Sequence, residues 1–469
     1  TGTHSLGDPA WLLPLWLRHL TRAGANVPAG TIVTTGTWCG LLPAKAGDTI
    51  YVDAGTYTET ITIDTDYIAI IGKDSDASRF DRGDSSSGTN AWGVYASNRT
   101  GLLLRNLHVR NSYNGVYLSA VKNSRFETVA IASIGLYGLY TISNSDTNTY
   151  RYLDISSCSD HAVNMDNSFG NTFIKSRVAG NASAAFYVAT NSRNNLFDEN
   201  TVTGNDKGVW FTLGSAYNVV TSSRIAANFT AIRLSGGDTN IIRQCDISSN
   251  SKFIEIAGAS SGNVIAKNNI IANSSGFSNG FGSSVVFSRN WFGTADESSI
   301  AATYTDTASP FRPYRLGPVD TAQAADTTAP AAPTGVTLDA ATAGRITVSW
   351  TNPSLNEETN GGSVGHQGVK IYRLRNTADT IHWANVLVWT SGAADTTWND
   401  TGATDGATYY YRLTSRDGAA LVNESYFTDT VFAASIALIP ETISLVSGDH
   451  QLGAVGAGLQ VCVRVVDAT

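Results

Sequence analysis

The feature that most constrains the fold of this chain is a repeat of 22 to 25 residues that runs from Asn98 to Gly293. A period of this length is typical of solenoids, in which each repeat stacks on the one before it. The period is too short for two parallel strands joined by a helix, because such a crossover alone takes about a dozen residues. The repeat therefore predicts a parallel β-helix whose coils each hold three short strands.

Two columns of asparagine recur once per repeat, each at a polar turn beside an apolar strand. Asparagine tolerates left-handed backbone at sharp corners, and stacked asparagine side chains can hydrogen bond from coil to coil. We therefore expect a structural role and inward-facing side chains, so that the N-x-S/T frames at Asn181, Asn228 and Asn273 carry no glycan. The first column holds Asn123, Asn148, Asn171, Asn195, Asn218, Asn240 and Asn263, and the second holds Asn181, Asn205, Asn228, Asn250 and Asn273.

A third column is a strand that alternates with period 2, which separates an inward face from an outward face. The predicted inward residues are Val116, Leu118, Leu139, Val163, Met165, Phe186, Val188, Val209, Phe211, Ile232, Leu234, Ile254 and Ile256. The outward row reads Tyr117, Tyr140, Asn164, Tyr187, Trp210, Arg233 and Glu255.

Aligned outward aromatic side chains are unusual on a soluble protein that has no partner for them. The row predicts a platform that stacks sugar rings, or an interface with another subunit. A loop or module of the same chain folded over the row is the alternative. The candidate binding or interface residues are Tyr117, Tyr140, Tyr187, Trp210 and Arg233.

Composition excludes several classes of protein. Charged residues make up only 15% of the chain, and the net charge of -8 comes with no block of Lys or Arg, which argues against a nucleic-acid partner. No stretch of about 20 apolar residues is present to span a bilayer. The chain starts at Thr1 without Met, so we expect a processed N-terminus and a secreted, cell-surface protein, with residues 1–30 capping the solenoid.

Four cysteines, at positions 39, 158, 245 and 462, show no CxxC spacing, so neither a zinc site nor a redox motif is predicted. Cys158 and Cys245 lie nearly four coils apart in the repeat, which is too far for a disulfide. We expect both to be free, buried thiols.

Several segments resemble a known family of solenoids. Residues 46–59 (AGDTIYVDAGTYTE), 61–63 (ITI) and 70–72 (IIG) resemble the opening coils of pectin-lyase-like β-helix proteins, including the NosD-like and carbohydrate-active groups. Residues 290–293 (NWFG) resemble the motif that closes such helices. The resemblance implies an all-β protein with a right-handed parallel β-helix over residues 31–318, in a fold where many members cleave acidic polysaccharides.

A linker rich in Ala, Thr and Pro is predicted over residues 319–333, and a different pattern follows it. Segments 346–350 (ITVSW), 369–373 (VKIYR) and 408–413 (TYYYRL) have the spacing of a β-sandwich, and residues 334–435 resemble a fibronectin type III domain. Residues 436–469 resemble the start of a bacterial Ig-like repeat of the invasin type. Their alternating Val461, Val463 and Val465 are expected to form an assembly strand that pairs with another copy of the chain.

One coil carries acid, base and cation together. Lyases of this fold need a carboxylate cluster for Ca²⁺ and a base, and hydrolases need close carboxylates. The polygalacturonase motifs are missing, and Asp154, Arg177, Arg224 and Asp246 fall at equivalent positions, so a ladder of opposite charges is the preferred interpretation. The weak catalytic candidates are Asp154, Asp160, His161, Asp166, Lys175 and Arg177.

Three hypotheses for function follow. The first is an extracellular, noncatalytic scaffold, such as an adhesin, a surface-layer protein or a fibre subunit, preferred because the catalytic motifs are missing and the last module is incomplete. The second is a secreted polysaccharide lyase or glycoside hydrolase that acts on an acidic glycan. The third is a glycan-binding module. The expected partners are other copies of the chain or surface glycans, with no cofactor and no metal unless a lyase binds Ca²⁺.

Overall fold

The computed structural model describes residues 32–34, for which only the backbone is considered, 44–88, 91–304, 306, 308–322, 325–357, 365–377, 383, 386–404 and 406–437. The chain divides into two compact units, residues 1–294 with 299–327 and residues 295–298 with 328–469. The predicted cap (residues 1–30), Cys39, Cys462 and the predicted assembly strand (Val461, Val463 and Val465) lie outside the described residues.

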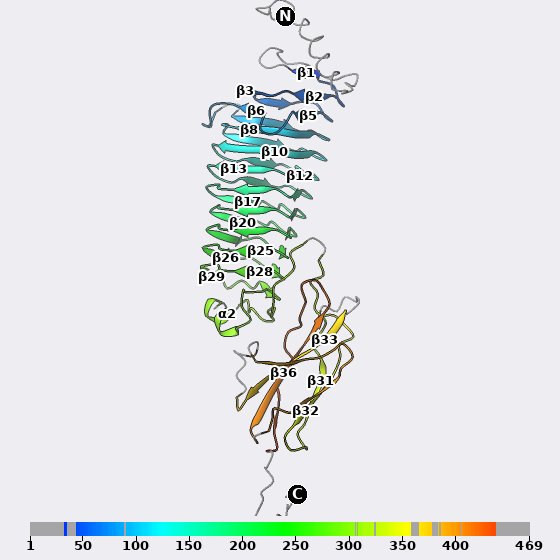
Figure 1. The fold of residues 1–469 in the computed structure, drawn as a ribbon. Coiled ribbons are helices and arrows are strands. Elements are labelled where there is room, and N and C mark those ends of the chain that lie inside the picture. Colours follow the sequence, from blue (N-terminus) through cyan, green and yellow to red (C-terminus); the bar gives the residue numbers. More distant parts are fainter. Residues whose placement is uncertain are drawn as a thin grey trace, which may run out of the picture. The chain divides into compact units, whose positions relative to one another are not determined.

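The first unit is a right-handed parallel β-helix of about 10 turns, as the sequence predicts. Figure 1 shows its strands stacked coil upon coil, from β2 (Thr49–Val52) to β29 (Ser275–Asn279). The coils form three parallel stacks of strands. From Leu103 onward, residues 22 to 24 positions apart pair in register, as in Tyr187 with Trp210 and Phe173 with Phe197. The repeat in the sequence therefore folds into three parallel β-sheet faces.

The first stack consists of β1 (Ile32–Thr34), β2 (Thr49–Val52), β5 (Ala69–Gly72), β8 (Leu103–Arg110), β10 (Arg125–Ile134), β12 (Thr149–Arg151), β15 (Thr172–Ile174), β18 (Leu196–Asp198), β21 (Val219–Thr221), β24 (Ile241–Arg243), β27 (Val264–Ala266) and β30 (Val286–Ser288). The second stack consists of β3 (Gly55–Tyr57), β6 (Ser78–Asp81), the later halves of β8 and β10, β13 (Asp154–Cys158), β16 (Arg177–Ala179), β19 (Thr201–Thr203), β22 (Arg224–Ala226), β25 (Asp246–Ser248) and β28 (Asn269–Ile271).

The third stack consists of β4 (Ile61–Ile63), β7 (Trp92–Ser97), β9 (Asn114–Ser119), β11 (Leu139–Ile142), β14 (Val163–Asp166), β17 (Ala184–Ala189), β20 (Lys207–Thr212), β23 (Thr230–Ser235), β26 (Lys252–Gly258) and β29 (Ser275–Asn279). Helix α2 (Glu297–Thr303) follows the last coil.

The interior of the β-helix confirms the predicted inward column. All of its members are buried, with Phe211, Val188 and Leu234 fully enclosed. Aromatic rings also stack inside along the first stack, from Phe126 through Tyr150 to Phe173. Cys158 and Cys245 are free, as predicted, and burial raises the pKa of each thiol to about 12, so both are protonated at neutral pH.

Asparagine ladders hold the corners together, as predicted. In the first column, Asn195 Oδ1 accepts from the backbone N–H of Asn171, one coil before, and its Nδ2 donates to Asn218 Oδ1 at 2.9 Å. In the second, Asn228 Oδ1 accepts from the backbone N–H of Asn205 in the same way. Asn181 and Asn228 are 3% and 2% exposed, which leaves their amides inside the ladder rather than available to a glycan.

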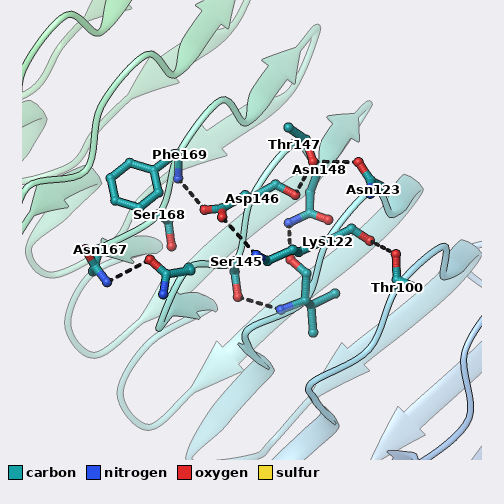
Figure 2. A network of polar contacts seen from close by, with 12 residues as sticks. Thr100, Lys122, Asn123, Ser145, Asp146, Thr147, Asn148, Asn167, Ser168 and Phe169 are labelled. Atoms are coloured by element: carbon teal, nitrogen blue, oxygen red, sulfur yellow. Dashed lines mark hydrogen bonds and ion pairs between the residues drawn. The ribbon is translucent and has the colours of Figure 1, made fainter.

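Two details of the first column differ from the prediction. The left-handed residue is the one before each ladder asparagine, such as Thr147 at φ 55° or Tyr217 at φ 57°, because the turn has to close before the side chain can point inward. Asn123 itself is left-handed at φ 51° and lies opposite Thr147, so it is not a rung. Ser124 takes that place, and its N–H donates to Asn148 Oδ1 at 2.9 Å. Figure 2 shows the hydrogen bond from the Thr147 hydroxyl to Asn123 Oδ1.

The second unit contains two antiparallel sheets around one core, the arrangement of a β-sandwich. One sheet is ordered β31 (Thr334–Asp339), β32 (Ile346–Thr351), β35 (Thr397–Asp400), and the other β34 (Leu387–Thr390), β33 (His366–Arg375), β36 (Thr408–Asp417), β37 (Val431–Ala434). Trp350 from the first sheet and Ile371 and Tyr411 from the second share that core. The assignment to the fibronectin type III family stays a prediction.

Candidate binding surface

The outward row of the third stack forms one continuous aromatic surface. The register pairs Tyr117 with Tyr140, Tyr140 with Asn164, and Tyr187 with Trp210, so the row stacks one residue per coil as predicted. Ring contacts extend it to residues outside the predicted row. We call this set the aromatic stripe: Trp92, Tyr95, Tyr117, Tyr137, Tyr140, His161, Tyr187 and Trp210.

The reasons why the predicted row did not include these residues can be identified. Tyr95 belongs to the same row, in register with Tyr117, but it precedes Asn98, where the repeat becomes visible. Tyr137 and His161 lie two residues before their strands' first inward residues, at the corner where alternation fails. A search for aromatic residues extended one coil upstream would have found Tyr95.

The stripe is not the exposed flat platform that the sequence predicts. Its rings are half-buried because they pack on one another, and Asn164 is only 6% exposed. Tyr95 and Tyr117 stack with centroids 5.6 Å apart and planes 25° apart, so they turn edges rather than faces outward. The ring planes turn by 88° between Tyr117 and Tyr140, which interrupts the stack.

Trp210 ends the stripe in a fixed orientation. Its indole N–H donates to Ser235 Oγ at 2.7 Å, and its ring lies edge-on to Tyr187, with planes 83° apart. The guanidinium of Arg233 lies 4.4 Å from the ring centroid, which adds a cation–π contact. The candidate Arg233 therefore supports Trp210 and also pairs with Glu255 at 3.5 Å.

His161 fills the gap that Asn164 leaves in the row of rings. Its imidazole stacks on Tyr187, with centroids 4.2 Å apart, and on Tyr137, with centroids 5.7 Å apart. Burial lowers the pKa of His161 to about 4, although the carboxylate of Asp160 opposes the shift. Nδ1 accepts a hydrogen bond from the Ala184 N–H at 3.2 Å, so the neutral ring carries its proton on Nε2.

The tyrosine hydroxyls of the stripe are protonated donors at neutral pH. Burial raises the pKa of Tyr140 to about 12, and the nearby Asp166 carboxylate adds to the shift. Burial also raises the pKa of Tyr117 and Tyr187. Within the described part of the chain, the hydroxyls of Tyr117, Tyr140 and Tyr187 form no hydrogen bond, which leaves them available to a ligand.

The six catalytic candidates do not form one site. Asp160, His161 and Asp166 lie at the aromatic stripe, where both carboxylates act on the pKa of Tyr137 and Tyr187. Asp154 and Arg177 pair at 2.8 Å on the second stack, and Lys175 pairs with Glu199 at 3.5 Å. The coil turns between these positions, so residues that are close in sequence lie on different faces.

The predicted charge ladder is present on the second stack. Asp154 pairs in register with Arg177, Arg177 with Thr201, Thr201 with Arg224, and Arg224 with Asp246. In the described ranges, no group of three or more His, Cys, Asp or Glu side chains could hold a metal ion. No helix in the same ranges is long and apolar enough to cross a bilayer.

Comparison with known proteins adds a family match for part of the chain. Residues 85–225 match the family model described as "Right handed beta helix region". No curated protein matches the chain.

Several solved structures are similar to part of this chain at low sequence identity. The Azotobacter vinelandii mannuronan C-5 epimerase AlgE4 A-module is 14% identical over 52% of this chain and 79% of that chain, with a TM-score of 0.45. An alginate lyase from Paenibacillus sp. is 13% identical over 53% and 97%, with a TM-score of 0.42. PfbA, a surface adhesin of Streptococcus pneumoniae, is 11% identical over 56% and 72%, with a TM-score of 0.36.

Proposed function

We propose that this chain is an extracellular carbohydrate-binding protein, and that the aromatic stripe of the third stack is its binding surface. The observation that carries the proposal is the combination of groups on that one face. Aromatic rings continue from Trp92 to Trp210, and unpartnered tyrosine hydroxyls and half-buried carboxylates lie among them.

The chemistry of sugars matches this combination. A sugar ring presents C–H groups that pack on aromatic carbon, and hydroxyls that both donate and accept hydrogen bonds. The tyrosine hydroxyls and His161 Nε2 can donate to sugar oxygens, while Asp160 and Asp166 can accept from sugar hydroxyls. Because the register repeats the row at each coil, a chain of sugars along the stripe would meet similar groups repeatedly.

The scaffold hypothesis fits within this proposal. A parallel β-helix is a rigid support, and a binding face along it would suit an adhesin or another surface protein whose partner is a glycan. A second copy of the chain seated on the stripe is the competing occupant. Light scattering of the protein without added sugar distinguishes the two, since self-association raises the apparent mass.

Trp210→Ala tests the proposal directly. Loss of a buried aromatic anchor should weaken binding by about 2 kcal/mol or more, roughly 30-fold. The measurement is isothermal titration calorimetry with oligosaccharides chosen from a glycan array. Tyr152→Ala is the matched control, because Tyr152 is an exposed aromatic residue at the corner between the first and second stacks. Equal binding by both variants and the unaltered protein would refute the assignment of the stripe.

A glycoside hydrolase is the second candidate, because Asp160 and Asp166 bring two carboxylates to the same face. Hydrolysis of a glycosidic bond needs one carboxyl group as acid and a second as base or nucleophile. Release of reducing ends from a bound polysaccharide, abolished by Asp166→Asn, would support catalysis. Binding without release of reducing ends would support the noncatalytic proposal.

A further inference from the structure

At the aromatic stripe the cations form ion pairs, whereas two of the carboxylates do not. The strands from β7 to β26 of the third stack, with the three residues before each strand, carry three Lys or Arg side chains, Lys207, Arg233 and Lys252. All three form ion pairs. Lys207 pairs with Asp206, and Arg233 and Lys252 both pair with Glu255, at 3.5 Å and 3.4 Å. Each cation of this face therefore already has a carboxylate partner, and Arg233 and Lys252 share the same one.

Two carboxylates on the same face have no such partner. Among the described residues, neither Asp160 nor Asp166 forms an ion pair with Lys or Arg. Asp160 does contact the imidazole of His161, but this ring is neutral at pH 7. Both carboxylates act on the stripe by raising the pKa of Tyr137 and Tyr187, and Arg233 opposes them at Tyr187. The face thus holds four carboxylates against three cations, and the two carboxylates that form no ion pair with Lys or Arg lie at the stripe.

His161 provides an independent indication that a ligand binds at this surface. The residue is only 7% exposed, and its Nδ1 is occupied by the Ala184 N–H. Its Nε2 forms no hydrogen bond with any described residue, and this atom is not fully enclosed. It therefore faces outward between Tyr137 and Tyr187. A nearly buried N–H donor that opens only onto this surface suits a ligand oxygen.

We propose that the aromatic stripe is selective for glycans without acidic groups, with Asp160 and Asp166 as the residues that reject uronate sugars. This inference rests on the carbohydrate-binding function proposed above. Sugar hydroxyls satisfy the two carboxylates by donating to them, and His161 Nε2–H donates to a hydroxyl or ring oxygen. A uronate places its own carboxylate against the same two charges, while each nearby cation already has a carboxylate partner.

This selectivity is opposite to that expected for a lyase or hydrolase that acts on an acidic glycan, the enzyme alternative drawn from the sequence. Repulsion between like charges on a half-buried surface is screened only partly by salt. The penalty for a uronate should therefore become smaller at high salt but not disappear. Binding of the neutral sugar should change little, because it involves no net charge.

Matched oligosaccharides test the inference. Tetramers of galactose, glucose and mannose are compared with the tetramers of galacturonate, glucuronate and mannuronate in the same linkage, by calorimetry at low and high salt. We expect each bound neutral tetramer to bind about tenfold or more tightly than its uronate counterpart. In the double variant D160N/D166N, the gap should close to within about twofold, mainly because uronate binding improves.

Asp154→Asn is the control, since it removes one negative charge from the exposed ladder of the second stack and should leave the gap unchanged. Circular dichroism checks that each variant is folded. Uronate binding equal to or tighter than neutral binding in the unaltered protein would overturn the selectivity and leave glycan binding intact. If no tetramer binds, the proposed function itself fails, and the inference fails with it.

Discussion

His161 is the stripe residue whose protonation couples most directly to stability. The unfolded chain binds a proton on this histidine below about pH 6.5, whereas burial delays protonation in the folded protein to a pKa of about 4. Between these values the unfolded state holds more protons, so the free energy of unfolding falls as the pH drops from about 6.5 to about 4. The loss amounts to about 3 kcal/mol, and above pH 6.5 this group contributes no pH dependence.

Urea unfolding of the unaltered protein and of His161→Asn, at about pH 7 and about pH 4.5, measures this contribution. The asparagine can still accept from the Ala184 N–H, but it does not titrate. We expect the unaltered protein to lose more stability on acidification than the variant does. An identical loss in both proteins would show that His161 is not the group responsible.

Asn218 represents the ladders that connect one coil with the next. Its Oδ1 accepts from the Asn195 N–H at 3.0 Å, and its Nδ2 donates to Asn240 Oδ1 at 2.9 Å, all within the interior. Asn218→Ala removes the acceptor of the buried Asn195 N–H and one hydrogen bond from each of the Asn195 and Asn240 side chains, so we expect a loss of about 2–4 kcal/mol. Chemical denaturation monitored by far-ultraviolet circular dichroism measures it.

Asn218→Ser is the matched control for this change. Ser223 already occupies a rung of this kind and accepts from the Asn200 N–H at 3.0 Å through its Oγ. A serine at position 218 should therefore retain the most important acceptor and cost less than alanine. If serine and alanine destabilise equally, the acceptor on the ladder is not what the asparagine supplies.

The strands were more predictable than the corners between them. Period-2 alternation identified the buried column, including Phe186, Val209 and Ile254, because burial on one face of a strand leaves a direct trace in the sequence. At the corners, Asn123 appeared to continue a column that Ser124 in fact occupies. Asparagine and serine both serve as acceptors there, so residue identity alone did not define the register.

The candidate site was predictable only where it followed the strand period. The aligned positions of Tyr187 and Trp210 were evident, but the packing of the rings on one another was not, because sequence spacing does not report ring orientation. The weak catalytic candidates were grouped by closeness in sequence. The coil instead separates Asp154 on the second stack from Asp166 on the third.

At the scale of the whole molecule, the two units have separate cores and should unfold as separate transitions. In the second unit, the buried Asp400 accepts from Arg373 at 2.6 Å and from the Tyr411 hydroxyl at 2.7 Å. Asp400→Ala leaves Arg373 unpaired, which should cost about 3–5 kcal/mol and lower the melting temperature of that unit by more than about 10 °C. The β-helix transition should remain where it is.

Phe211→Ala is the reciprocal change, because Phe211 is fully enclosed in the β-helix. The cavity should cost about 3–5 kcal/mol and shift only the β-helix transition. Differential scanning calorimetry of the full chain and both variants resolves the two effects, since each substitution moves one of two heat-absorption peaks. A single peak that both substitutions shift would contradict independent units, because it would require the two cores to unfold together.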